Sequence, residues 1–189
     1  ATDPRWFRVN GTFGEEPEFI SEAIGTVIES YQGQELKEDS VALTIKHFPG
    51  GGARENGFDP HYAEGNFNVY PTPGSLEKYH LPPFKAAIKK QPSSIMPYYA
   101  IPSNEKSAMP QAPFEGEFEE VAFAFNKAMI TDLLKDTLGF NGYINSDTGV
   151  LDGMAWGVED LSKTERIAKG MNAGTDLFSG TNDVEAFRQ

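Results

Sequence analysis

The fold of this chain is decided by residues 139–147, which read Gly-Phe-Asn-Gly-Tyr-Ile-Asn-Ser-Asp. A short apolar run is bounded by glycine and ends on a Ser-Asp pair, which is typical of a buried strand that ends on a carboxylate. Two further apolar runs end in polar groups, since residues 41–47 finish in Lys-His and residues 94–99 finish in Tyr-Tyr. Polar side chains at the carboxyl ends of strands are typical of α/β barrels, which keep their chemistry there.

Segments with helical spacing alternate with these strands. Apolar residues and end signals predict helices over 18–31, 81–90, 124–138 and 162–172, and a fourth strand over 175–178. Strands that alternate with helices predict parallel pairing through right-handed crossovers. Polar residues at the ends of all four strands favour a barrel rim over an open, doubly wound sheet.

The length of the chain limits how much of a barrel it can form. The sequence has 189 residues, whereas a (β/α)8 TIM barrel needs roughly 250. We therefore expect an α/β fold in which residues 1–189 form one partial catalytic domain and supply about half of the barrel. Half a barrel leaves two unpaired strand edges, so we also expect a partner segment that completes it.

Composition excludes several classes of partner. The chain has 28 acidic and 16 basic residues, a net charge of −12, and no basic cluster. Nucleic acids and anionic membrane surfaces are therefore not expected partners. The absence of cysteine excludes disulfides and thiolate metal sites. The longest apolar runs are far shorter than a membrane span.

Five segments together resemble glycoside hydrolase family 3, the β-glucosidase and β-xylosidase group. Residues 3–8 (Asp-Pro-Arg-Trp-Phe-Arg) resemble its Pro-Arg-Trp-Gly-Arg segment, and residues 46–52 resemble its Lys-His-Phe-Pro-Gly motif. Residues 96–99 (Met-Pro-Tyr-Tyr) are similar to its Met-x-x-Tyr strand. Residues 139–147 are similar to its nucleophile segment, and residues 173–176 (Ala-Gly-Thr-Asp) to its last barrel strand. The motifs occur in the expected order and cover nearly the whole chain.

This resemblance implies a retaining, exo-acting β-glycosidase that hydrolyses terminal β-linked sugars of oligo- or aryl-β-glycosides. It implies that Asp147 is the nucleophile, which forms a covalent glycosyl intermediate. It also implies that Arg8, Lys46 and His47 bind the sugar hydroxyls and that Tyr99 lies beside the nucleophile. Fixed positive charges would keep the carboxylate ionised, as a nucleophile requires. Neither a cofactor nor a metal ion is expected.

The acid/base catalyst is the open point. The family commonly supplies a glutamate from a second, C-terminal sandwich domain, so we expect that domain and the first barrel half in cis or from another chain. In the N-acetylglucosaminidase branch, an Asp-x-His pair takes over this role. Asp59 and His61 form such a pair here, a little farther along the chain and with proline between them. Histidine titrates in the useful range and an aspartate can orient it.

Aromatic and arginine residues near the motifs allow more than one interpretation. The family usually has tryptophan directly after its Ser-Asp pair, whereas this chain has Thr148. Trp156 is the candidate that takes the place of this tryptophan as a substrate-binding platform. Large aromatics such as Trp6 and Trp156 are, however, mostly core residues. Arg5 is expected to form a structural ion pair. Residues 50–52, three glycines, are expected to allow close backbone packing.

Three functions remain open at this point. The first is a β-glucosidase-like hydrolase. The second is an N-acetylhexosaminidase or a phosphorolytic relative that uses His61, and the third is a non-catalytic remnant that only binds sugar. Taken alone, Asp147 could also be a turn or cap residue, and the Lys46-His47 pair an ordinary strand end. A secreted or periplasmic location is favoured over a cytoplasmic one.

Overall fold

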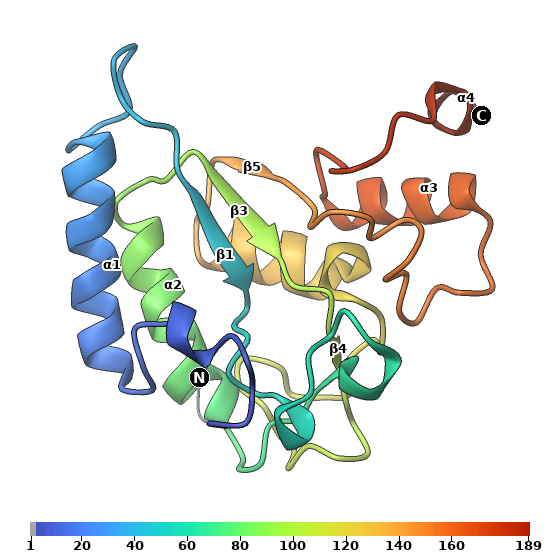
Figure 1. Cartoon of the computed structure of the whole chain (residues 1–189), viewed down its shortest axis with the longest axis horizontal. Helices are drawn as coiled ribbons and strands as arrows, with labels where there is room; N and C mark the ends of the chain where they lie inside the picture. The colour runs from blue at the N-terminus through green and yellow to red at the C-terminus, as the bar shows by residue number, and fades with distance from the viewer. Residues whose placement is uncertain (1–2) are drawn as a thin grey trace.

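The computed structural model describes residues 3–189, and its centre is a small parallel sheet. Strands β1 (Thr44–Phe48), β3 (Ser94–Pro97) and β5 (Tyr143–Ile144) lie side by side in the order β1-β3-β5 (Figure 1). Both strand pairs are parallel. Consecutive strands therefore lie next to each other with helical segments between them, as the sequence predicts.

Isoleucines fix the register of this sheet. Ile45 lies opposite Ile95, and Ile95 lies opposite Ile144. Ile95 and Ile144 are completely buried, and Ile45 nearly so. This row lies in the core, so a slip by one residue would turn it toward the other face of the sheet. The row thereby determines which side chains stand at the carboxyl ends of the strands.

Helical segments connect the strands of the sheet. Helix α1 (Pro17–Gln32) packs along α2 (Leu81–Ile88) beside β1 (Figure 1). A capping box between Ser162 and Glu165 opens α3, and Gly174, with a φ of +102°, ends it, as predicted. The helical elements are η1 (Val9–Gly11), α1 (Pro17–Gln32), η2 (Glu55–Gly57), η3 (Ala63–Gly65), η4 (Leu76–His80), α2 (Leu81–Ile88), η5 (Phe123–Phe125), η6 (Ala128–Thr137), α3 (Lys163–Ala173) and α4 (Val184–Arg188).

Three predicted boundaries were wrong. The strand expected over 41–47 begins at Thr44, and Val41 is half exposed. The helix expected over 124–138 divides into η5 and η6, because Asn126 has an extended backbone and its side chain accepts a hydrogen bond from the Met129 N–H. The fourth strand reduces to a single parallel bridge between Asn145 and Leu177.

A second, two-stranded sheet was not predicted. Strands β2 (Phe67–Asn68) and β4 (Ile101–Pro102) pair in parallel, and β4 lies beyond the arrowheads of β1 and β3 (Figure 1). The parallel order of β1, β3 and β5 agrees with the expected barrel type. The two small sheets do not by themselves establish half of a barrel.

The buried side chains form two clusters. The larger one contains residues of the sheet and of the helices α1, α2 and η6, such as Ile28, Ile95 and Leu134. The smaller one joins Tyr99 and Phe125 to residues 150–158, which follow β5. The loop after β5 is thus anchored in its own apolar core and positions the groups near Asp147.

Candidate active site

His47 and Asp147 meet at the carboxyl ends of β1 and β5. His47 Nε2 lies 3.2 Å from Asp147 Oδ2, and their side chains are 19% and 14% exposed. Tyr99, which follows β3, donates its hydroxyl to the carbonyl oxygen of Thr148. The ends of three neighbouring strands therefore bring together three predicted site residues.

The surroundings of Asp147 favour the ionised carboxylate. Burial raises its pKa, but hydrogen bonds from His47 and from the Thr148 N–H, with a smaller contribution from Tyr99, outweigh burial and lower the pKa overall. The Thr148 N–H lies 2.8 Å from Asp147 Oδ1. Burial and the negative charge of Asp147 raise the pKa of Tyr99, so its hydroxyl stays a donor.

Tyr98 supports His47 from the other side. The two ring centroids lie 4.8 Å apart, and the buried Arg54 guanidinium lies 4.9 Å from the Tyr98 ring centroid. A Cβ on Gly51 would lie 3.3 Å from the Tyr98 ring and 3.4 Å from Trp6. The glycine at position 51 thus allows the close packing that the sequence predicts.

Asp59 is a buried acceptor for several donors. Its side chain is 2% exposed, and Trp6 Nε1–H donates to Oδ2 at 2.8 Å. The backbone N–H of His61 donates to Oδ1 at 3.0 Å, and His61 Nδ1 contacts the same oxygen. Arg8 Nε lies 3.6 Å from Oδ2. Burial raises the pKa of Asp59, but the bonds from Trp6 and His61 lower it overall.

The pair of Asp59 and His61 lies beside the nucleophile candidate. The His61 ring packs edge-on against Tyr99, with centroids 4.9 Å apart and planes at 74°. Tyr99 in turn contacts Thr148, the residue after Asp147. The structure therefore brings the poorly spaced Asp-Pro-His segment to the same place as Asp147.

The remaining predicted residues have mixed surroundings. Lys46 is exposed, and among residues 3–189 we find no hydrogen bond or ion pair of its side chain. Arg5 pairs with Asp3 at 2.6 Å, which confirms the expected structural ion pair. The Trp156 indole N–H donates to the Pro60 carbonyl oxygen at 2.8 Å.

Trp6 and Tyr98 are site residues that the sequence did not assign. Trp6 is 7% exposed, which fits its bond to Asp59 and not a sugar-stacking surface. The contact joins residues 53 positions apart, so no local pattern could reveal it. The sequence did hold one signal for Tyr98. It precedes Tyr99, a predicted site residue, directly after β3.

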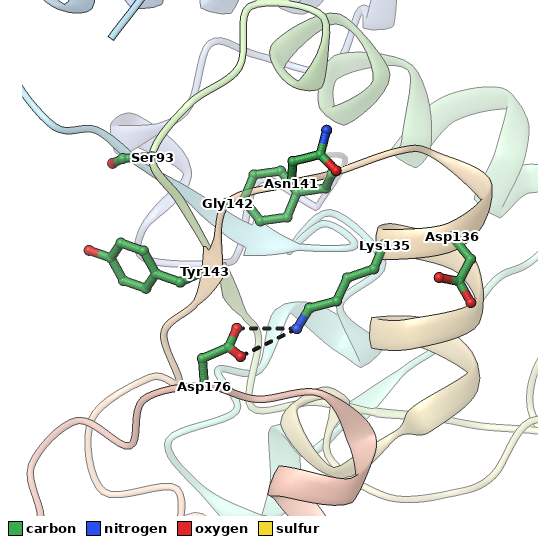
Figure 2. A pocket seen from close by; sticks show the side chains of 8 residues that line it. Ser93, Lys135, Asp136, Asn141, Gly142, Tyr143 and Asp176 are labelled. Carbon is green, nitrogen blue, oxygen red and sulfur yellow. Dashed lines mark hydrogen bonds and ion pairs between the residues drawn. The ribbon is translucent and has the colours of Figure 1, made fainter. Parts of the chain in front are cut away.

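A hollow of about 670 Å³ lies at the other end of the sheet (Figure 2). Lys135 bonds to Asp176 there, and Asp176 Oδ2 also accepts the Ile144 N–H at 2.7 Å. None of the predicted site residues lines it. At the amino ends of the strands such contacts stabilise the fold. It is lined by Ser93, Lys135, Asp136, Phe140, Asn141, Gly142, Tyr143 and Asp176.

Within residues 3–189, no group of three or more His, Cys, Asp or Glu side chains could hold a metal ion. In the same part of the chain, no helix is long and apolar enough to cross a membrane.

A parallel sheet that gathers a carboxylate, a histidine and a tyrosine at its carboxyl ends defines an α/β protein with a strand-end site. The chain belongs to glycosyl hydrolase family 3, because the family model "Glycosyl hydrolase family 3 N terminal domain" matches residues 1–186. The chain is structurally similar to part of a solved β-glucosidase, and the N-terminal domain of this family is of the TIM-barrel type.

Relatives carry glycosidase names. The chain is 41% identical over 199 residues to a "Probable beta-glucosidase C" of Aspergillus flavus, with 100% of this chain and 29% of the relative covered. It is 35% identical to a "Periplasmic beta-glucosidase/beta-xylosidase" of Dickeya chrysanthemi, with 97% and 30% covered. The structure of a β-glucosidase from Erythrobacter marinus matches with a TM-score of 0.77 and 26% identity, covering 100% of this chain and 23% of that one. This chain thus spans less than a third of each of these proteins.

Proposed function

We propose that the protein containing this chain is a retaining, exo-acting β-glycosidase of the β-glucosidase type. In this proposal Asp147 attacks the anomeric carbon of a terminal β-linked sugar and forms a covalent glycosyl intermediate, which water then hydrolyses. The observation that carries the proposal is the 3.2 Å contact between His47 Nε2 and the Asp147 carboxylate at the strand ends. Family membership and the names of the relatives support it.

The lowered pKa of Asp147 supports the role of nucleophile. An ionised carboxylate is ready before substrate arrives. Lys46 lies near the carboxyl end of β1 and Arg8 lies beside Asp59, and both are exposed cations available for the sugar hydroxyls. Contacts to hydroxyls that strengthen as the ring flattens toward an oxocarbenium ion would lower the barrier of the reaction. The Tyr99 hydroxyl, which donates to the Thr148 carbonyl oxygen, lies next to the carboxylate.

The acid/base catalyst has two candidates. Relatives at least three times longer than this chain leave room for a glutamate on a further domain, together with the rest of the barrel. The second candidate is His61, and the observation that favours it is its contact with buried Asp59 and its packing on Tyr99. A histidine in this role would point to an N-acetylhexosaminidase or to a phosphorolytic relative. A periplasmic relative supports a location outside the cytoplasm.

The test is made on the full-length enzyme with Asp147→Gly. Losing the nucleophile should lower turnover by several orders of magnitude while folding survives. Azide should then restore part of the activity and yield a glycosyl azide of inverted configuration, because the small anion enters the vacated space. Wild-type turnover in this variant would refute the proposal.

A second assay separates the alternatives. Aryl β-glucoside, β-xyloside and β-N-acetylglucosaminide are compared with and without phosphate. The β-glucosidase proposal predicts preference for the glucoside and no effect of phosphate. Preference for the acetamido sugar, or acceleration by phosphate together with loss of activity in His61→Ala, would favour the second candidate. Sugar binding without turnover of any substrate would favour the non-catalytic remnant.

A further inference from the structure

The segment of residues 59–61 carries two groups of the site but belongs to no helix or strand. The backbone of this segment packs tightly against Gly65, because a Cβ at position 65 would lie 2.3 Å from the Asp59 carbonyl oxygen. The Asp59 carboxylate is fixed by the Trp6 indole N–H. These contacts hold the first residue of the segment, whereas His61 also depends on how the peptide at Pro60 is oriented.

Trp156 fixes that peptide from across the site. Its indole N–H donates to the Pro60 carbonyl oxygen at 2.8 Å, although the two residues lie 96 positions apart. Trp156 follows Asp147 in the loop after β5, whereas Pro60 lies in the loop after β1. The bond therefore joins the loop that carries the nucleophile candidate to the peptide that precedes His61.

Hydrogen bonds and close backbone packing hold the loop around Trp156. The Ala122 N–H donates to the Trp156 carbonyl oxygen at 3.0 Å. Gly157 has a φ of +76°, and a Cβ there would lie 2.5 Å from the Glu120 carbonyl oxygen, so the backbone packs closely against that segment. The Arg166 guanidinium donates to three carbonyl oxygens of the same loop, those of Leu151, Val158 and Glu159.

We propose that Trp156 is a positioning residue, whose indole N–H holds the Pro60 carbonyl so that His61 stays packed on Tyr99 beside Asp147. The inference rests on the proposed function together with its second acid/base candidate, because it requires that His61 takes part in the reaction. It assigns Trp156 a role through its N–H group, which differs from a stacking platform that would act through its ring. The two roles predict opposite results for a phenylalanine at this position.

The experiment is a double-mutant cycle in the full-length enzyme. Trp156→Phe keeps an aromatic ring and removes the N–H, and it is measured alone and together with His61→Ala. We expect Trp156→Phe alone to lower kcat/KM roughly two- to tenfold, the range of one neutral hydrogen bond, with the loss mainly in kcat and a changed pH profile. In the His61→Ala background it should cause no further loss.

A matched control removes a similar bond far from the site. Thr131 Oγ1–H donates to the Ala173 carbonyl oxygen at 2.9 Å, so Thr131→Val should lower the melting temperature and leave kcat/KM and the pH profile unchanged. If Trp156→Phe has wild-type kinetics, or lowers kcat/KM equally in both backgrounds, the inference is wrong. It is also wrong if His61→Ala alone has no effect.

Two further measurements keep the result unambiguous. If Trp156→Phe does not fold, site-specific 3-benzothienylalanine at position 156 replaces the N–H by sulfur at nearly the same shape, with the same expected kinetics. Asp147→Gly in parallel reports on the proposed function itself. Activity retained by that variant refutes the nucleophile, whereas an additive cycle with an inactive Asp147→Gly refutes only the role of Trp156.

Discussion

His47→Ala is the substitution whose effect follows most directly from the geometry. It removes the group that lies 3.2 Å from the Asp147 carboxylate, in a place where both side chains are less than one fifth exposed. A hydrogen bond to a charged group contributes about 1.5–3 kcal/mol, and each 1.36 kcal/mol is tenfold in rate. We therefore expect kcat/KM of the full-length enzyme to fall about 10- to 150-fold.

The same variant should change the pH dependence in a fixed direction. His47 lowers the pKa of Asp147 against the opposing effect of burial. Without His47 the pKa of Asp147 rises, so the acidic limb of the profile of kcat/KM against pH should move to higher pH. Initial rates on an aryl β-glucoside from pH 3 to 9 measure both effects. An unchanged acidic limb with full activity would refute the assignment of the His47–Asp147 pair.

Three further outcomes are expected. Gly65→Ala should destabilise the protein by about 1–3 kcal/mol and lower activity, because its Cβ displaces Asp59; Gly116→Ala, with open space around its Cβ, should change neither melting temperature nor rate. Arg8→Ala should lower kcat/KM, whereas Arg5→Ala should leave the kinetics unchanged, and the reverse result would exchange their roles. Residues 1–189 expressed alone should be oligomeric or insoluble and show no glycosidase activity, whereas a soluble, active monomer would contradict the need for further segments.

The stability of the protein in acid should depend on the buried carboxylate of Asp59 and the partly buried carboxylate of Asp147. The pKa values of Asp59 and Asp147 are lower in the folded protein than usual, so their stabilising effect is present above the unfolded pKa of about 3.9 and disappears as the pH falls through the folded values. Asp59→Asn should lower the free energy of unfolding at neutral pH and weaken its dependence on pH below about 4. Denaturant titrations at pH 3 and 7 measure this, and an unchanged dependence would contradict it.

The sequence predicts the central sheet because each strand has its own local pattern. Ile45, Ile95 and Ile144 lie in apolar runs and meet in register. Polar residues that follow such runs must gather at one edge when the strands are parallel, which is why His47 and Asp147 could be predicted to meet. The start of α3 could likewise be predicted, because the capping box is recognised from four consecutive residues.

The contacts made by loops could not be predicted in this way. The bonds from Trp6 to Asp59 and from Trp156 to Pro60 join segments 53 and 96 residues apart. No periodic pattern in the sequence indicates such contacts. The break at Asn126 depends on its side chain, which accepts a hydrogen bond from the Met129 N–H and so competes with the helix. Short strands such as β2 and β4 carry too few residues to show a pattern.

Covalent trapping tests the central claim, that Asp147 is the nucleophile, most directly. The full-length enzyme is incubated with a 2-deoxy-2-fluoro-β-glucoside that has an activated leaving group, which slows hydrolysis of the intermediate. Intact mass and peptide mapping then locate the sugar. If Asp147 is the nucleophile, the peptide that contains it carries one fluoroglucosyl group, and the label is lost in Asp147→Gly. A label on another residue, or turnover that inverts the anomeric configuration, would contradict it.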